Sequence, residues 1–118
     1  MTTTSAILAG LLALVFLALG TAKILALAPM RERAAEAGFS TASYRRIGVL
    51  EIAGAAGLLT GLIEPLIGGL AGAGLLLMLG GALVVHLRNG DGTRKFTPAV
   101  ICGVLVAAYL MLLFGATR

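Results

Sequence analysis

The sequence predicts an all-α integral membrane protein that folds as a single four-helix bundle. Apolar residues make up 59% of its 118 residues and charged residues 12%, whereas soluble domains average roughly 45–50% and about 25%. Mean hydropathy is +1.06. Only helices and closed barrels satisfy their backbone groups in lipid, and the apolar runs here are continuous rather than alternating. We therefore expect membrane-spanning helices, with no room for a separate soluble domain.

The first span is expected at residues 6–27 and stops at Pro29. Its charges follow the apolar run, which is the wrong order for a cleaved signal peptide, although Ala26-Leu27-Ala28 resembles a cleavage site. Residues 31–37 then read as a short surface helix, because Pro29 lies near its start and Gly38 at its end.

The second span is expected at 44–63, after capping side chains between Ser40 and Ser43. Glu64-Pro65 is the turn into the third span, at 66–87. One helix through both spans would be too long for the bilayer, so a tight helical hairpin is predicted. Asn89-Gly90-Asp91-Gly92 is a strong turn signal before the fourth span, which is expected at 98–114 and begins near Pro98.

The positive charges predict the orientation of these spans. Seven Lys and Arg residues lie in or beside the connections 28–43 and 88–97, whereas the opposite side has Arg118 alone. The positive-inside rule therefore places both connections in the cytoplasm and both termini outside. The expected location is the plasma (inner) membrane, crossed several times.

Several classes of function are excluded by composition. The net charge of +4 is explained by membrane topology, so nucleic acid is not an expected partner. A single cysteine excludes an internal disulfide and a self-contained thiol–disulfide enzyme. The sequence has no metal-ligand cluster, no nucleophile–base set and no phosphate-binding loop, so we expect no metal site and no enzyme acting on its own.

Each span carries a reactive or ionisable side chain near the end that is expected to be cytoplasmic. An ionisable residue in a membrane span is by default a candidate functional site. Glu51 is too short to reach the headgroups from its depth, so it needs a proton or a partner, such as Lys23, Tyr44 or a backbone group. The candidate ligand-binding cluster is Lys23, Glu51, His86, Tyr44 and Cys102.

Each of these residues also has a purely structural interpretation. Lys23 can extend its amine to the headgroups, or pair with Glu51 merely to close the bundle. His86, beside Arg88, fits an ordinary interfacial residue, and Cys102 a small packing residue. Gly57-x-x-x-Gly61 and Gly68-x-x-x-Gly72 are small-residue faces, which we assign to packing within the bundle rather than to dimerisation.

The order of these residues resembles the DoxX-like family over essentially the whole chain. The matching segments are Phe16-x-x-x-Gly20-x-x-Lys23-Ile24, Gly48-x-x-Glu51-Ile52-x-Gly54, His86-Leu87-Arg88 and Pro98. The resemblance implies a small four-helix membrane bundle. Founding members of the family are described as a membrane subunit of a thiosulfate:quinone oxidoreductase, mycobacterial relatives as a partner of redox enzymes, and more distant relatives as an endoplasmic-reticulum chaperone for acetylcholine receptors.

Three functions stay open from the sequence. The first is an accessory subunit of a quinone-linked membrane oxidoreductase, with a redox enzyme or other membrane protein as partner and a quinone as the cofactor to test. The second is a non-enzymatic assembly factor, chaperone or small-lipophile-binding protein. The third is a proton-coupled carrier using Glu51. Small multidrug resistance proteins are similar in size, but their coupling glutamate lies in the first span, where this chain has Lys23. The sequence leaves homo-oligomerisation open.

Overall fold

The computed structural model describes residues 3–36, 38–90 and 92–115, apart from the side chains of residues 93–96. Five helices and no strand occur in these ranges. They are α1 (Thr3–Ile24), α2 (Ala28–Glu36), α3 (Thr41–Thr60), α4 (Pro65–Arg88) and α5 (Thr93–Gly115). The prediction of an all-α bundle is confirmed, and the short helix expected at 31–37 is present as α2. Residue 37 lies outside the described residues.

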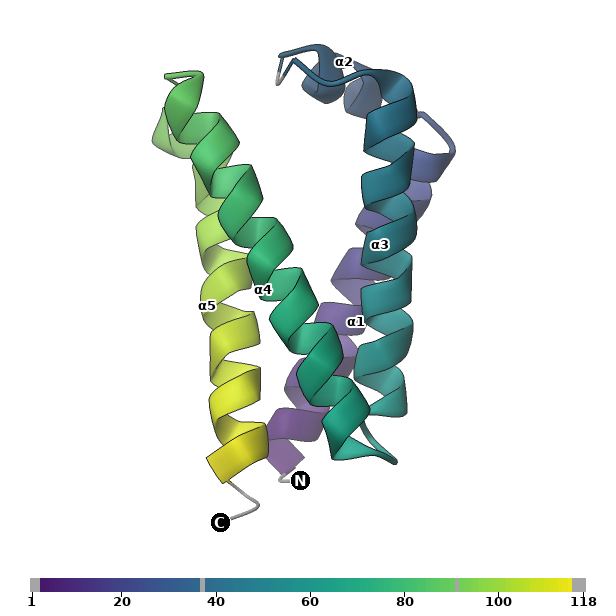
Figure 1. The fold of residues 1–118 in the computed structure, drawn as a ribbon, viewed down its shortest axis with the longest axis vertical. Helices are drawn as coiled ribbons and strands as arrows, with labels where there is room; N and C mark the ends of the chain where they lie inside the picture. Colours follow the sequence, from purple (N-terminus) through teal and green to yellow (C-terminus); the bar gives the residue numbers. More distant parts are fainter. Residues whose placement is uncertain (1–2, 37, 91, 116–118) are drawn as a thin grey trace.

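The four long helices run alternately up and down (Figure 1). α1 packs against α3 and α5, and α4 packs against α3 and α5, so α1 and α4 occupy diagonal positions. α2 lies across one end of α1 and α3. We call this end of the bundle the α2 end, and the opposite end, where α1 begins and α5 stops, the termini end. Toward the α2 end, the α4–α5 pair leans away from the α1–α3 pair.

Three helices are long and apolar enough to cross a membrane: α1, α4 and the Thr97–Gly115 part of α5. This makes the chain a multi-pass membrane protein. α3 is 20 residues long, but Arg45, Arg46 and Glu51 lower its hydropathy below that of the other long helices. The composition of α3 therefore does not by itself identify it as the fourth span.

The apolar core fills the termini half of the bundle. Its largest buried side chains include Phe16 of α1, Leu58 of α3, Leu75 of α4, and Val106 and Tyr109 of α5. Tyr109 is fully buried, and within the described residues its hydroxyl makes no hydrogen bond. The inner faces of all four long helices thus contribute to one core.

Glycines bring α3 and α4 into close contact. A Cβ built on Gly57 would lie 2.6 Å from Ala71, and one on Gly61 would lie 2.6 Å from Cα of Gly68 and 2.9 Å from the Tyr109 hydroxyl. The predicted role of these glycine faces in packing within the bundle is therefore confirmed. Gly74, Gly80 and Gly81 of α4 differ, because a Cβ on any of them would meet nothing within 4 Å.

The helix ends follow the expected capping chemistry, with one exception. The Ser40 side chain caps α3 by accepting from the Ser43 backbone N–H, and Glu64 caps α4 immediately before Pro65. Both α1 and α2 end in a Schellman arrangement, which needs one residue in the left-handed region. After α2 this residue is Gly38 (φ 80°), but after α1 it is Ala26 (φ 52°), a conformation that is strained for a residue with a side chain.

The fourth span expected at 98–114 agrees with the membrane-length segment Thr97–Gly115, although the helix that contains it starts earlier and encloses Pro98. α5 begins at Thr93. Pro98 is the sixth residue of α5 and lies just beyond the first turn, whose N–H groups have no partner within the helix. At its actual position Pro98 removes the hydrogen bond that an N–H would donate to the Arg94 carbonyl. The membrane-length segment begins at Thr97.

Candidate functional site

Two glycines set the register between α1 and α3. A Cβ built on Gly20 would lie 2.7 Å from the Gly48 carbonyl oxygen and 3.3 Å from Cβ of Glu51. A Cβ on Gly48 would lie 2.7 Å from the Gly20 carbonyl oxygen and 2.9 Å from Cβ of Lys23. Because the helices are antiparallel, Gly20 faces Glu51 and Gly48 faces Lys23. Each glycine therefore makes room for the charged residue of the other helix.

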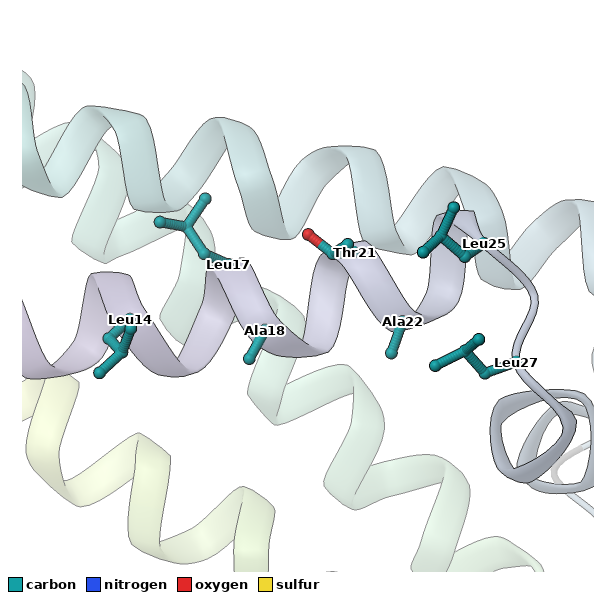
Figure 2. Close-up of a pocket in the computed structure, with 7 residues that line it drawn as sticks. All are labelled: Leu14, Leu17, Ala18, Thr21, Ala22, Leu25 and Leu27. Carbon is teal, nitrogen blue, oxygen red and sulfur yellow. The ribbon is translucent and has the colours of Figure 1, made fainter.

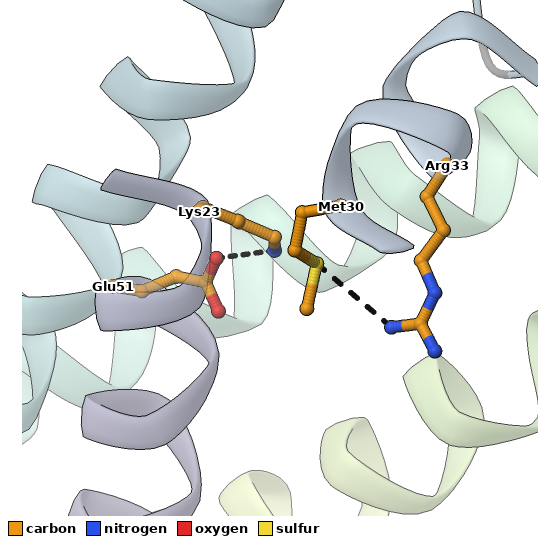
Figure 3. Close-up of polar contacts among 4 residues, drawn as sticks. All are labelled: Lys23, Met30, Arg33 and Glu51. Atoms are coloured by element: carbon orange, nitrogen blue, oxygen red, sulfur yellow. Dashed lines mark hydrogen bonds and ion pairs between the residues drawn. The ribbon is translucent and has the colours of Figure 1, made fainter. Parts of the chain in front are cut away.

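This register directs the two charged side chains toward each other. Helical side chains lean toward the N-terminus of their own helix. Lys23 therefore leans toward the level of Glu51, and Glu51 leans toward the level of Lys23. The Lys23 ammonium donates a hydrogen bond to Oε1 of Glu51 and forms an ion pair with it (Figure 3). The pair that the sequence proposed as one interpretation is thus present between α1 and α3.

The ion pair is largely enclosed by protein. The Glu51 residue is 3% exposed, and the side chain of Lys23 is 14% exposed. Lys23 Nζ lies 5.0 Å from the centre of the Tyr44 ring, within the range of a cation–π contact. The Phe39 ring lies beside Tyr44, with 6.3 Å between the ring centres. Tyr44 therefore belongs to the site through its ring face.

α2 supplies a residue that the sequence analysis did not include in the cluster. Met30 is 7% exposed, and Figure 3 shows it between the Lys23–Glu51 pair and the guanidinium of Arg33. The Arg33 Nη1 group lies 3.9 Å from the Met30 sulfur, to which it donates a weak hydrogen bond. Met30 and Ala34 are the buried residues of α2 and are spaced i, i+4. That spacing of two apolar residues in a charged segment is the signal that would have identified them.

The inner faces of the long helices change character toward the α2 end. Residues spaced by four, seven or eleven positions share one face of a helix. On every long helix this face is mainly apolar in the termini half, where α1 also buries Ser5, and it carries a polar or reactive residue in the α2 half. The faces are Leu12, Phe16 and Lys23 on α1; Glu51, Ala55 and Leu58 on α3; Leu75, Leu79 and His86 on α4; and Cys102, Val106 and Tyr109 on α5.

The structure brings together Lys23, Glu51 and Tyr44 in direct contact. His86 and Cys102, both partly buried, lie on the other pair of helices. His86 is on α4, diagonal to the α1 helix of Lys23, and Cys102 is on α5, diagonal to the α3 helix of Glu51. The predicted cluster thus divides into a contacting trio and two residues at the same end of the facing helices.

The contacting trio offers hydrogen-bond chemistry. The Lys23 ammonium has three donors and the Glu51 carboxylate accepts at two oxygens, so one ion pair leaves both groups with further capacity. Among the described residues there is no group of three or more His, Cys, Asp or Glu side chains placed to hold a metal ion. The hydrogen-bonding groups of the site are therefore the unused ammonium donors of Lys23 and the second carboxylate oxygen of Glu51.

One comparison with known proteins gives a match. The model of the DoxX-like family matches residues 7–109, which includes the Lys23–Glu51 pair, Tyr44, His86 and Cys102. No curated protein and no solved structure matches the chain significantly.

Proposed function

The chain belongs to the DoxX-like family, and from this premise we propose that it is a non-catalytic accessory subunit of a quinone-linked oxidoreductase in the inner membrane. Its role in that system is to bind the quinone head near the Lys23–Glu51 pair. Lys23 would donate to a quinone carbonyl, and Glu51 would accept from a quinol hydroxyl. His86, Cys102 and Tyr44 complete the candidate site at the α2 end.

The observation that carries this proposal is the enclosed ion pair between two helix backbones in close contact. A charged residue in a membrane span is costly and is tolerated when it faces the protein interior and has a partner. Gly20 and Gly48 provide that position, and α2 shields it through Met30. Each of the four long helices carries at least one candidate site residue toward the same end, which supports a binding role beyond that of a single structural contact.

A second candidate function is a non-enzymatic assembly factor. It is favoured if the Lys23–Glu51 pair has only a structural role. Lys23 and Glu51 compensate each other's charge, which is sufficient to explain their burial as a device that holds α1 on α3. The two functions differ in what removal of both charges does. A scaffold would keep its partners, whereas a quinone-binding subunit would lose its ligand.

Quinone that copurifies with the protein provides the test. Replacing both partners of a buried pair can be nearly neutral for stability, so the double variant Lys23→Met/Glu51→Gln is expected to remain folded. We expect quinone extracted from purified wild-type protein and from a Tyr109→Phe control, and at least about tenfold less from the double variant. Equal amounts in all three proteins, or none in the wild type, would contradict the quinone role and favour the scaffold.

We propose that α3 is the fourth membrane span. α1 and α4 begin at the same end of the bundle and run in the same direction (Figure 1). If both cross the bilayer, the chain must cross back between them. α2 has 9 residues, too few for this, whereas the 20 residues of α3 extend about 30 Å. Its inward-facing Glu51 and terminal Arg45 and Arg46 are compatible with a span whose charges are paired or lie at the interface.

The proposed orientation places the α2 end in the cytoplasm and both termini outside. Seven of the eight positive residues outside the first apolar run lie in or beside the connections at the α2 end. An alkaline phosphatase fusion after residue 118 is expected to be active, because this reporter folds outside the cytoplasm, and a green fluorescent protein fusion at the same point is expected to be dark. The reverse pattern would invert the orientation.

A further inference from the structure

The Lys23–Glu51 pair is covered by one short helix, α2. Met30 of α2 is buried and lies between the pair and the guanidinium of Arg33 (Figure 3). Within the described residues, α2 contacts α1 and α3, the two helices that carry the pair, and no other helix. A ligand that approaches the pair from the α2 end therefore meets α2 first.

α2 is held on the bundle by few apolar contacts. Met30 and Ala34 are the buried residues among its nine, while its four charged residues are all exposed. Elements with few buried apolar contacts are the ones that open at the lowest free energy. α2 is thus the part of the enclosure that is easiest to displace, because α1 and α3 are held by the close contact of Gly20 with Gly48.

The two connections of α2 each contain a residue in the left-handed region, Ala26 before the helix and Gly38 after it. A hinge consists of a few residues at the ends of an element that absorb the change in backbone angles. Ala26 has a side chain, so its left-handed conformation is strained, and a rotation that takes it out of this region releases the strain. Strain at Ala26 therefore favours displacement of α2, whereas Gly38 adopts its conformation without strain.

The connection between α1 and α2 also borders open space. An apolar groove of about 390 Å³ runs along α1 from Leu14 and ends at Leu25 and Leu27, which flank Ala26 (Figure 2). Its lining comes from α1 and this connection alone. Leu25 is 64% exposed and Leu27 is 48% exposed. A rotation at Ala26 therefore does not have to pull a buried side chain out of the core on either side of it.

We propose that α2 is a lid over the Lys23–Glu51 pair, hinged at Ala26 and Gly38, and that it lifts to expose the pair while the four long helices stay packed. In the closed position Met30 shields the pair, and Ala26 holds strain that opening releases. That a quinone enters when the lid lifts rests on the proposed function. The opening itself does not depend on the identity of the ligand.

A cysteine on the buried side of α2 measures the opening of the lid. Ala34→Cys is placed in a Cys102→Ala background, where it is the only thiol of the chain. Purified protein is labelled with a permanently charged methanethiosulfonate reagent, and the labelling rate is followed by mass spectrometry. Ala35→Cys, exposed on the same helix, gives the rate for a fully accessible thiol. Ala55→Cys, buried in the core and away from α2, gives the rate that global unfolding alone would produce.

We expect Ala34→Cys to react more slowly than Ala35→Cys and at least about tenfold faster than Ala55→Cys. Ala26→Gly removes the strain from the closed position, so it should slow labelling at position 34 about fivefold. Gly38→Ala adds strain to the closed position and should speed this labelling by a similar factor. Neither hinge substitution should change the rate at position 35. Because the same cysteine is present in the proteins compared, its own effect on the lid cancels.

Oxidation of Met30 by hydrogen peroxide reports the same opening without a substitution in α2, and it should slow by the same factor in Ala26→Gly. Equal labelling rates at positions 34 and 55 would mean that α2 opens only when the protein unfolds. Equal rates at positions 34 and 35 would mean that α2 does not close. Either result would overturn the lid, as would labelling that responds to neither hinge substitution. The experiment needs no quinone, so its failure is distinguishable from loss of the quinone role, which is tested with Lys23→Met/Glu51→Gln.

Discussion

The termini half and the α2 half of the bundle are built from the same four helix faces but are held together differently. In the termini half these faces carry large apolar side chains, with Phe16, Leu58 and Tyr109 in one core. In the α2 half, α1 and α3 touch through Gly20 and Gly48 and carry an ion pair, while α4 and α5 lean away. The first half is stabilised by packing among four helices, and the second by the close contact of α1 with α3, by the contacts of Lys23 with Glu51 and Tyr44, and by the cover that α2 provides.

This difference shows why the polar residues gather at one end. A membrane bundle gains little from the hydrophobic effect, so close packing and polar contacts must hold its helices together. The termini half satisfies this requirement mainly by packing among the four helices. The α2 half is less packed, and it can carry polar groups because α3 and α1 pair them. Mutations should therefore have different effects in the two halves.

The largest effect is expected from removing one partner of the ion pair. Lys23→Met leaves the Glu51 carboxylate buried without a counter-charge, which commonly costs about 3–5 kcal/mol. The double variant Lys23→Met/Glu51→Gln should recover most of that loss. The free energy of unfolding is measured in detergent with increasing denaturant for the wild type, the two single variants and the double variant. These four values make up a double-mutant cycle.

Two outcomes of this cycle bear on the α2 half. If the effects of the two single substitutions simply add, the residues do not interact and the electrostatic account of this half is wrong. If Glu51→Gln costs as much as Glu51→Ala, the charge of Glu51 matters; if Glu51→Gln is milder, hydrogen bonding by the carboxyl dominates.

A smaller loss is expected from adding one methyl group between α1 and α3. In Gly20→Ala the new Cβ would lie 2.7 Å from both the Gly48 carbonyl oxygen and the Ile52 side chain. The helices must separate, at a cost of about 1–3 kcal/mol. Gly10→Ala is the control on the same helix, because position 10 is open, and it should be neutral or slightly stabilising. The thermal unfolding midpoint should fall for Gly20→Ala and should stay the same or rise for Gly10→Ala; an unchanged midpoint for Gly20→Ala would refute the proposed close contact.

Substitutions at the turns that follow α1 and α2 are expected to change the free energy of unfolding by about 1 kcal/mol. Ala26 is in the left-handed region, which costs a residue with a side chain roughly 1–2 kcal/mol and costs glycine little. Ala26→Gly should therefore stabilise the protein. Gly38→Ala, at the equivalent position after α2, should destabilise it by a similar amount. The denaturant concentration at the unfolding midpoint should rise for Ala26→Gly and fall for Gly38→Ala. A change in the same direction for both variants would contradict the claim that the turn after α1 is strained and the turn after α2 is not.

The smallest effect is expected in the packed termini half. Tyr109 has a buried hydroxyl without a hydrogen-bond partner among the described residues, wedged against Gly61 and Gly68. Tyr109→Phe removes this unsatisfied group and should be neutral or stabilising by less than about 1 kcal/mol. The free energy of unfolding is measured by thermal unfolding. A decrease of more than about 1 kcal/mol would mean that the hydroxyl has a hydrogen-bond partner and that this half also depends on polar contacts.

The fold class could be predicted from sequence because composition and apolar run length decide it. The glycine faces of α3 and α4 were also readable, since small residues at a spacing of four permit close helix contact. Whether α3 spans the membrane was harder to predict, because Arg45, Arg46 and Glu51 lower the hydropathy on which span prediction depends. Pro98 indicated the start of the fourth span to within one residue, although α5 itself begins at Thr93.

The candidate site was only partly readable from the sequence. Depth along each apolar run indicated that Lys23 and Glu51 lie at a similar level, but the pairing depends on the register set by Gly20 and Gly48. Which helices are neighbours and which are diagonal follows from tertiary packing, so the placement of His86 and Cys102 on the facing pair of helices could not be predicted. Met30 was missed because α2 contributes through its orientation across the end of the bundle.

The register between α1 and α3 also has a consequence for how the chain enters the membrane during synthesis. α3 has the weakest affinity for lipid among the long helices, since a charge near the helix centre opposes insertion by about 2.5–3.5 kcal/mol. α1 is made first and carries the compensating lysine at the matching height. We expect α1 to remain beside the insertion machinery until α3 emerges, so that the two enter as a pair. In this way Lys23 would lower the free-energy cost of inserting the helix that contains Glu51.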